Sequence, residues 1–447
     1  MTERLFGTDG IRGQANVHPM TPELALRVGR AAGSHFRIDD RPHTILIGKD
    51  TRQSGYMLEN SLTAGLCSMG INVLLVGPLP TPGVSYIMRS LRCDAAIMIS
   101  ASHNPYDDNG IKFFGPDGYK LADEIEDKIE RLVTSDELDA DRPTGTEIGR
   151  ARRIDDAVGR YIEYAKSTFP KGMRLDGLRI VCDCANGAGY RAGRNALEEL
   201  GADVIAIGVD PDGTNINEGC GSTAPEEMRA RIINEKADLG IAFDGDGDRV
   251  IMADAESRLL DGNALLTILG NDLLQRGQLP NNTVVTTVMA NGGLDRALER
   301  HGGQVLRTKV GDRYVVEAMR DQKLTLGGES SGHIVMLEHN TTGDALIAAL
   351  QVLATIISTG KTIAELASAY QPMPEEHAKI PINGGQKPTQ ETLDGLRIKA
   401  ETALNGKGRI VIRPSGTEPI IRVMVQHESN TEAKTLVQEL SDQITAL

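Results

Sequence analysis

The stretch Ala237-Asp238-Leu239-Gly240-Ile241-Ala242-Phe243, followed directly by Asp244-Gly245-Asp246-Gly247-Asp248-Arg249, decides the fold class of this chain. Its first half is a continuous apolar run rather than an alternating one, which is typical of a strand buried on both faces of a parallel sheet. Its second half is acidic and rich in glycine, so the strand ends in a polar loop. Apolar strands and amphipathic helices alternate in the same way on both sides of it, which predicts α/β domains with mixed, mainly parallel sheets.

Three sets of strands and helices follow one another along the chain. Proline just inside an expected helix start, as in Thr81-Pro82, supports these assignments because the missing N–H would have no partner within the helix. The expected elements are strand 44–48, helix 55–69, strand 71–76, helix 82–92 and strand 94–100 in the first set; strand 178–183, a helix ending near 200, strand 202–207, a helix from 225 and strand 237–243 in the second; and strand 283–287, helix 294–300, strand 304–307, helix 312–320 and strand 323–327 in the third.

The last part of the chain has a different pattern. After Gln371-Pro372-Met373-Pro374, which is typical of a linker, we expect a strand, a helix at 390–404, strands at 409–413 and 420–427, and a closing helix. The last two strands flank a tight loop, which predicts a smaller antiparallel α+β domain. The sequence thus predicts three α/β domains and one α+β domain, with bounds at 1–151, 152–254, 255–370 and 371–447.

The composition restricts the class of protein and its partners. The chain has 447 residues, 40% of them apolar, and its formal charge is −14, from 48 basic and 62 acidic side chains. This charge disfavours nucleic acid and anionic lipid as partners. The apolar stretch 345–357 is too short for a membrane span and predicts a buried helix. Five cysteines without a secretion signal predict reduced thiols and a cytoplasmic location.

The acidic loop 244–249 is the most specific chemical motif. Residues two apart in an extended segment point the same way, so Asp244, Asp246 and Asp248 are expected to converge. Three close carboxylates repel one another unless a cation lies among them, and oxygen ligands favour Mg²⁺, Ca²⁺ or Mn²⁺. A solvated acidic turn is the alternative, but the apolar strand in front of the loop favours the metal site.

The segment Ser100-Ala101-Ser102-His103-Asn104-Pro105 also follows an apolar strand. Ser102 beside His103 suggests a nucleophile and its base. However, adjacent residues in an extended loop diverge, and the segment has no G-x-S-x-G elbow. Taken alone, this segment is better interpreted as an ordinary polar turn.

Two further loops carry side chains suited to a sugar phosphate. Gly327-Gly328-Glu329-Ser330-Ser331-Gly332-His333 combines a carboxylate, hydroxyls and an imidazole, which suit sugar hydroxyls, although a flexible turn is equally consistent. Arg413-Pro414-Ser415-Gly416-Thr417-Glu418-Pro419, with Arg422 beyond it, concentrates guanidinium groups, hydroxyls and backbone amides in an acidic protein. This second loop favours a phosphate site over a plain hairpin loop.

A glycine-rich segment suggests a competing function. Gly187-Ala188-Gly189-Tyr190-Arg191-Ala192 fits G-x-G-x-x-G/A after strand 178–183, and Asp210 ends the next strand, as in a dinucleotide site. The pattern is weak in a chain with 49 glycines, and Asn186-Gly187 can simply form a tight turn. A dinucleotide-dependent sugar-phosphate oxidoreductase and a catalytically silent sugar-phosphate sensor therefore stay open as alternatives.

Taken together, the polar loops resemble those of the α-D-phosphohexomutases, and the resemblance extends over nearly the whole chain. The motifs that carry it are 100–105, 244–249, 328–333 and 413–419. Two more segments, Gly7-Thr8-Asp9-Gly10-Ile11-Arg12-Gly13 and Val310-Gly311-Asp312-Arg313-Tyr314-Val315, are similar to the branch of the family that acts on glucosamine phosphates. Related hexomutases often have a histidine near 310–313, so the resemblance leaves the general acid and base unassigned.

This resemblance implies four domains around a central cleft, and interconversion of glucosamine 6-phosphate and glucosamine 1-phosphate, a step toward UDP-N-acetylglucosamine. Glucose or mannose phosphates are the alternative substrates within the family, and a homodimer is left open. The resemblance implies that Ser102 is a phosphoserine and that it binds Mg²⁺ together with Asp244, Asp246 and Asp248. It implies that Arg12 and Lys112 lie beside the transferred phosphoryl group. It further implies that the sugar is bound by Glu329, Ser331 and His333, and the distal phosphate by Arg413, Ser415, Gly416, Thr417 and Arg422.

Overall fold

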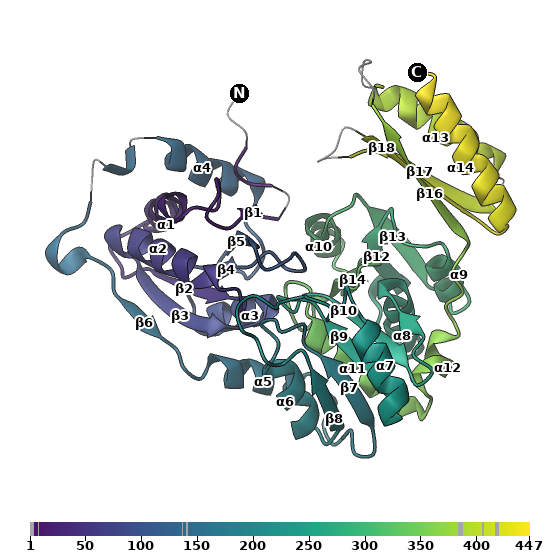
Figure 1. Ribbon diagram of the computed structural model, residues 1–447, viewed down its shortest axis with the longest axis horizontal. Coiled ribbons are helices and arrows are strands. Elements are labelled where there is room, and N and C mark those ends of the chain that lie inside the picture. The colour runs from purple at the N-terminus through teal and green to yellow at the C-terminus, as the bar shows by residue number, and fades with distance from the viewer. Residues whose placement is uncertain are drawn as a thin grey trace.

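Four β-sheets organise the chain, and each forms the centre of one domain (Figure 1). The computed structural model describes residues 4–7, 9–135, 137–139, 142–382, 388–404, 406–415 and 420–447. Within these residues, three sheets combine parallel and antiparallel strands and the fourth is wholly antiparallel. The expected fold class of three mixed α/β domains and one smaller α+β domain is therefore confirmed.

The first domain consists of β1 (Ile11–Gln14), α1 (Pro22–Phe36), β2 (Thr44–Lys49), α2 (Ser54–Ser68), β3 (Asn72–Pro78), α3 (Thr81–Ser90), β4 (Ala95–Ile99), β5 (Asp108–Phe114), α4 (Asp123–Thr134) and β6 (Ala151–Arg153). Its sheet has the order β1-β5-β4-β2-β3-β6. The strands β4, β2, β3 and β6 are parallel, whereas β5 is antiparallel to both β4 and β1. Because β6 runs to Arg153, the expected division after residue 151 falls inside this strand.

The second domain consists of α5 (Ala157–Ser167), β7 (Arg179–Asp183), α6 (Ala192–Glu199), β8 (Asp203–Ile207), α7 (Glu226–Glu235), β9 (Leu239–Phe243), β10 (Val250–Asp254) and β11 (Leu259–Leu260). The third consists of α8 (Gly262–Gln275), β12 (Thr283–Thr287), α9 (Gly293–Glu299), β13 (Gln304–Thr308), α10 (Asp312–Asp321), β14 (Leu326–Gly328), β15 (Ile334–Met336), α11 (Ala345–Thr359) and α12 (Ile363–Ala367). Their sheets have the orders β11-β10-β9-β7-β8 and β13-β12-β14-β15.

One arrangement recurs in the first three sheets. The strand that ends at a polar loop, β4, β9 or β14, is followed by an antiparallel neighbour, β5, β10 or β15. The loops 100–107, 244–249 and 329–333 each connect such a pair of strands. The sequence predicted the strands before the loops but not these short return strands, which fix both ends of each loop on its own sheet.

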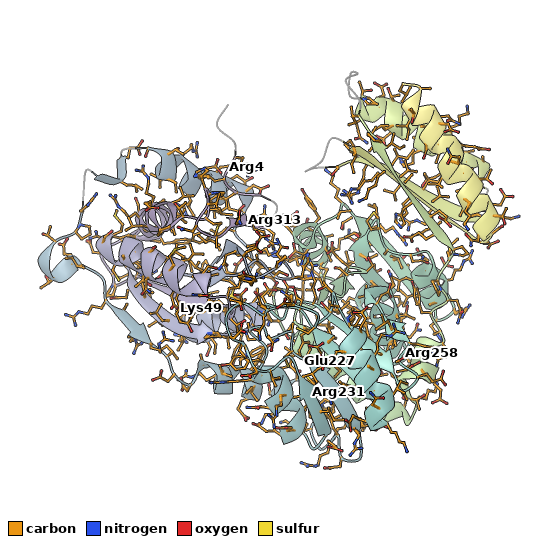
Figure 2. The ribbon with its side chains drawn as sticks, in the orientation of Figure 1. Arg4, Lys49, Glu227, Arg231, Arg258 and Arg313 are labelled. Carbon is orange, nitrogen blue, oxygen red and sulfur yellow. The ribbon has the colours of Figure 1, made fainter. Side chains whose placement is uncertain are left out.

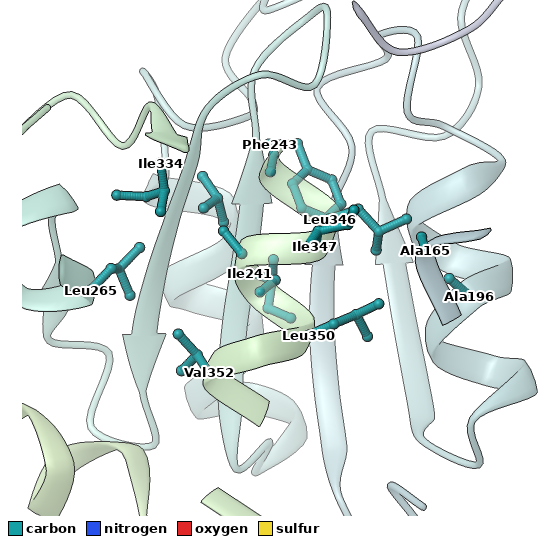
Figure 3. Packing of buried hydrophobic residues seen from close by; sticks show 14 of the residues in the cluster. Ala165, Ala196, Ile241, Phe243, Leu265, Ile334, Leu346, Ile347, Leu350 and Val352 are labelled. Atoms are coloured by element: carbon teal, nitrogen blue, oxygen red, sulfur yellow. The ribbon is translucent and has the colours of Figure 1, made fainter. Parts of the chain in front are cut away.

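Helix α11 joins the second and third domains through their apolar cores (Figure 3). Leu346 and Leu350 lie on α11, and Ile241 and Phe243 lie on β9; all four are buried in one cluster. Burying a side chain of this size is worth roughly 1.5–3 kcal/mol. The expectation that 345–357 forms a buried helix is confirmed, and no helix among the described residues is long and apolar enough to cross a membrane.

Polar contacts join the first domain to the third. Figure 2 shows Arg313 between these domains, near Arg4. The Arg313 guanidinium donates to Leu121 O at 2.6 Å and to Glu126 Oε2 at 3.2 Å, and it also pairs with Asp123. These contacts connect α10 to the start of α4, so the third domain approaches the first at the edge of the site described below.

The fourth domain consists of β16 (Glu375–Pro381), α13 (Gln390–Ala403), β17 (Gly408–Pro414), β18 (Ile420–His427) and α14 (Asn430–Thr445). Its strands pair antiparallel, as the sequence predicted, and their order is β16-β18-β17. The domain rests on the third domain, where Gly292 N donates to Gln426 Oε1 at 2.9 Å and Arg409 Nη1 donates to Ala290 O at 2.9 Å. In Figure 1, α13 and α14 cover the sheet face turned away from the first domain.

Candidate active site

The carboxylates of Asp244, Asp246 and Asp248 come together in the loop between β9 and β10. One oxygen of each lies within 4.8 Å of the others, and all three side chains are buried. The loop turns rather than running extended, because Gly247 has a φ of 71°. The expected convergence is therefore present, but a turn, and not the alternation of an extended chain, produces it.

The electrostatics of this loop fit a divalent cation. Burial, followed by repulsion from Asp248 and Asp246, raises the pKa of Asp244 well above its usual value. Burial acts in the same direction on Asp246, but Lys112 outweighs it and lowers the pKa of that carboxyl. Among the described residues, Asp246 Oδ1 and Asp248 Oδ1 are buried without a hydrogen-bond partner. Two buried, unpartnered carboxylate oxygens beside a third are a donor set for a hard cation.

Ser102 lies against this acidic loop, although it belongs to the first domain. Its Oγ donates a hydrogen bond to Asp244 Oδ2 at 2.6 Å, and its N–H donates to Ser100 Oγ at 2.9 Å. The expectation that Ser102 and His103 diverge is wrong: Ser102 Oγ lies 3.3 Å from His103 Nδ1. The reason is the left-handed φ of 53° at Ser102, which turns the loop instead of extending it.

The predicted basic residues reach the site from two paired strands. Arg12 on β1 stands opposite Gly110 on β5, two residues from Lys112. Lys112 Nζ lies 2.9 Å from Asp246 Oδ2, 3.2 Å from Asp9 Oδ2 and 3.9 Å from Asp248 Oδ2. Burial would lower the pKa of Lys112, but these carboxylates outweigh it and raise the pKa. Arg12 pairs with Asp9, so Asp9 lies between the two cations.

The loop 329–333 reaches the same centre from the third domain. Arg249 forms an isolated β-bridge with His333, and Val250 N donates to Gly332 O at 3.0 Å. His333 is 2% exposed, and its Nε2 lies 3.6 Å from Asp312 Oδ2 and 3.9 Å from Asp248 Oδ2. Glu329 Oε1 accepts from Gly311 N at 3.2 Å, whereas Ser331 is exposed.

A cavity of about 850 Å³ opens between the first three domains at this centre. Arg12, Asp248, Glu329 and His333 are among the side chains that line it. The loops 244–249 and 329–333 therefore meet at one cavity, and the Ser102 loop lies behind it, against Asp244.

The predicted phosphate loop lies on the fourth domain, apart from this centre. Arg413 on β17 and Arg422 on β18 are cross-strand neighbours, and Ser415 N donates to Ile420 O at 2.8 Å. Burial, with a contribution from Arg422, lowers the pKa of Arg413. Gly416 and Thr417 lie outside the described residues.

Arg52 is a residue of this site that the sequence analysis missed. Its guanidinium is fully buried and donates to the carbonyls of Ser102 at 2.9 Å, Asn104 at 2.8 Å and Asp108 at 3.1 Å. Asp50 Oδ2 accepts from Arg52 Nε at 2.8 Å and from Ser100 Oγ at 2.6 Å. Arg52 thus gathers the carbonyls of the Ser102 loop. The sequence signal for Arg52 was the run of charged residues directly after the apolar run 44–48. Because β2 ends beside β4, those residues lie next to the Ser102 loop.

The sequence analysis did not assign four further residues to the site, namely Asp9, Thr81, Lys120 and Asp312. Thr81 Oγ1 donates to Asp246 Oδ2 at 2.8 Å, and Lys120 pairs with both Asp9 and Asp312. These contacts join segments far apart in the sequence, so no local pattern indicated them.

The glycine-rich segment 187–192 packs behind the acidic loop. A side chain at Gly187 would place its Cβ 2.4 Å from Gly245 O, and Ala188 N donates to Gly245 O at 2.8 Å. Close backbone packing therefore accounts for the glycine, which favours a structural role over a dinucleotide site.

Family models match almost the entire chain. Those for the α/β/α domains I, II and III of phosphoglucomutase/phosphomannomutase match residues 3–140, 159–257 and 261–373, and the model for the C-terminal domain matches 358–443. The chain belongs to the phosphoglucomutase/phosphomannomutase family. As a member of this phosphohexomutase family, it is an isomerase that transfers a phosphoryl group within its substrate.

Two curated relatives of this family member resemble it closely. A phosphoglucosamine mutase of Magnetococcus marinus is 52% identical over 444 residues, which cover 99% of this chain and 92% of that protein. One of Paracoccus denitrificans is 52% identical over 442 residues, or 98% of each chain. A crystal structure of a phosphoglucomutase/phosphomannomutase family protein from Burkholderia thailandensis has a TM-score of 0.80 at 24% identity, covering 98% of this chain and 96% of that one.

The contacts of Arg52 lead to a prediction about stability. Arg52→Met leaves Asp50 as a buried charge without its partner, so the free energy of unfolding should fall by about 3–5 kcal/mol. Urea denaturation followed by circular dichroism measures this. Arg37→Met is the control, because Arg37 is 38% exposed and lies 3.9 Å from Glu147; removing such a surface pair should cost about 1 kcal/mol or less. Equal losses in the two variants would contradict the role given to Arg52.

Proposed function

We propose that this chain interconverts glucosamine 6-phosphate and glucosamine 1-phosphate, the reaction that the names of its curated relatives describe. The observation that carries the proposal is the Ser102 hydroxyl, which donates to Asp244 within a buried group of three carboxylates at the meeting point of three domains. A hydroxyl, an acidic group able to hold a cation and an adjoining cavity are the parts that phosphoryl transfer through a serine requires.

Ser102 is the proposed carrier of the phosphoryl group. The bond from phosphorus to Ser102 Oγ breaks as a bond to a hydroxyl oxygen of the sugar monophosphate forms, and the proton of that hydroxyl ends on Ser102 Oγ. The product is a sugar bisphosphate, and the reverse transfer takes its other phosphoryl group. Asp244 Oδ2 accepts from Ser102 Oγ at 2.6 Å, so it can orient the Ser102 hydroxyl between transfers.

Mg²⁺ is the proposed metal, held by Asp244, Asp246 and Asp248 together with an oxygen on phosphorylated Ser102. A phosphoserine carries about −1.5 to −2 charges at pH 7, which three neighbouring carboxylates alone would repel. When bound, the ion offsets negative charge on the oxygens of the transferring group. The buried, unpartnered oxygens of Asp246 and Asp248 support this assignment.

Arg12 and Lys112 are proposed to attract the phosphoryl group as it moves. Both lie beside Asp9, and Arg12 lines the cavity. Fixed cations need no reorganisation as charge moves between the donor and acceptor oxygens, which is why they favour the transition state.

The sugar and its second phosphate are proposed to bind at two separate places. Glu329, Ser331 and His333 take the sugar, and Arg413, Ser415, Gly416, Thr417 and Arg422 take the phosphate that is not being transferred. Because the reaction exchanges the two ends of one sugar, the bisphosphate must turn around between transfers. Short polar side chains tolerate both orientations better than a tight apolar pocket does.

Several finer assignments belong to the same proposal. The domains are proposed to divide near residues 151, 254 and 370, with β6 completing the first domain and β11 the second. The proposed partners are small sugar phosphates, and the product leads toward UDP-N-acetylglucosamine in the cytoplasm. Glucose or mannose phosphates are the alternative substrates. A homodimer is the alternative to a monomer.

Removing the metal should abolish the reaction. We expect EDTA-treated protein to be inactive and to recover with added Mg²⁺, and Asp246→Asn to lose most turnover because it removes an anionic ligand while keeping the shape of the side chain. A coupled assay of glucosamine 1-phosphate formation measures both. Glu227→Gln, an exposed change of the same kind on α7, is the control and should retain activity. Full turnover in metal-free protein would contradict the assignment.

Active protein should carry one phosphoryl group on Ser102. We expect mass spectrometry of the tryptic peptide to find it there, and Ser102→Ala to retain little mutase activity because it removes the hydroxyl that donates to Asp244. Ser90→Ala, an exposed serine on α3, is the matched control. Ser100 is unsuitable as a control because its Oγ binds both Ser102 N and Asp50. Near-normal turnover of the Ser102→Ala variant would overturn the carrier role.

Glucosamine phosphates should be the preferred substrates. We expect their kcat/KM to exceed that of glucose phosphates by about 10–200-fold, because replacing one amine by a hydroxyl changes a single polar contact. The measurement is a coupled assay with glucosamine, glucose and mannose phosphates. Equal or better turnover of glucose or mannose phosphates would leave the family membership intact and reject the glucosamine assignment.

A further inference from the structure

One row of the C-terminal sheet carries a cation on each of its three strands. Lys379 on β16 pairs in register with Arg422 on β18, and Arg422 pairs with Arg413 on β17. Their chain neighbours Ile380, Ile421 and Ile412 lie in the core of the domain. Since side chains alternate across a strand, the three cations lie on the opposite face, away from α13 and α14.

The three cations border a hollow next to the third domain. A cavity of about 210 Å³ is lined by Lys379, Arg413 and Arg422, together with His377 and with Met289 from the loop after β12. Like charges on directly opposite residues of a sheet destabilise it. An anion in this hollow would reduce that repulsion, so the arrangement favours a ligand site at this row.

Lys379 carries a charge that is available to a ligand. It is exposed, and within the described part of the chain no carboxylate forms an ion pair with it. Its neighbour His377 is different, because its Nε2 lies 2.5 Å from Glu375 Oε1. Lys379 also lies outside the motif 413–419, so the sequence motif alone does not include it.

We propose that Lys379 is a binding residue for the phosphate that is not being transferred, acting with Arg413 and Arg422. This inference rests on the proposed function and adds a residue to its distal phosphate site. A phosphate monoester carries nearly two negative charges at neutral pH. Two guanidinium groups offer it flat pairs of N–H donors, and a lysine ammonium adds a compact charge with freely turning donors. Both substrate orientations present such a phosphate, so a site that recognises its charge serves both.

The test replaces the charge and keeps the length of the side chain. In Lys379→Met we expect KM for glucosamine 6-phosphate and for glucosamine 1-phosphate to rise about tenfold or more, with kcat nearly unchanged, because a charged contact equally strong in ground and transition states is lost. The rise in KM should shrink at high ionic strength. Lys434→Met is the matched control: Lys434 lies on α14, on the opposite face of the sheet, 3.9 Å from Glu376 Oε1.

A second measurement separates this inference from the proposed function. Calorimetric titration with inorganic phosphate should give a weaker Kd in Lys379→Met than in the wild type and Lys434→Met, while the phosphorylation of Ser102 is unchanged. If the wild-type protein turns over none of the glucosamine phosphates, the proposed function is rejected. The Kd for phosphate would still test whether Lys379, Arg413 and Arg422 bind an anion. Equal effects of the two lysine substitutions on KM and Kd, or a fall in kcat with KM unchanged, would overturn the role of Lys379.

Discussion

Repulsion among three buried carboxylates is the constraint on which the site depends. Asp244, Asp246 and Asp248 hold their oxygens within 4.8 Å of one another, and no single domain supplies the groups that make this tolerable. Thr81, Ser102 and Lys112 come from the first domain, and the backbone of Gly332 anchors the following strand from the third. Lys112 and Arg249 supply two positive charges against these three carboxylates, which leaves an excess of negative charge. A divalent cation would balance it, so docking of the domains and metal binding are expected to stabilise each other.

The convergence of the loops follows from one arrangement used three times. In each α/β domain a buried strand ends in a polar loop and an antiparallel strand returns beside it, so both ends of the loop are tied to the sheet. Loops fixed in this way can carry strained or close-packed residues. Ser102 at a φ of 53° and Gly187 against Gly245 are examples. Arg52 adds to this for the Ser102 loop by binding the carbonyls of Ser102 and Asn104 and that of Asp108 at the start of β5, since a loop has few backbone partners of its own.

The sequence predicted what depends on local pattern. Continuous apolar runs located the strands before each polar loop, and the spacing of Asp244, Asp246 and Asp248 indicated the acidic cluster. The return strands β5, β10 and β15 were missed because each is recognised by its pairing with another strand, and the local sequence pattern does not show that pairing. The close approach of Ser102 to His103 was also missed, because a positive φ at a residue other than glycine leaves no mark in the sequence. The roles of Arg52 and Lys120 depend on tertiary contacts, which the local sequence pattern does not show.

The division of the proposed site between domains has a chemical consequence. In the proposal, the phosphoryl group is transferred where the first three domains meet, and buried contacts hold the loops there. The other phosphate is proposed to bind on the fourth domain, which rests on the third through polar contacts such as Gln426 with Gly292 and Arg409 with Ala290. A sugar bisphosphate that turns around must exchange its two phosphates between these places. Recognition by charge alone is indifferent to which carbon bears the phosphate, so the proposed row of cations on the fourth domain would let one site serve both halves of the reaction.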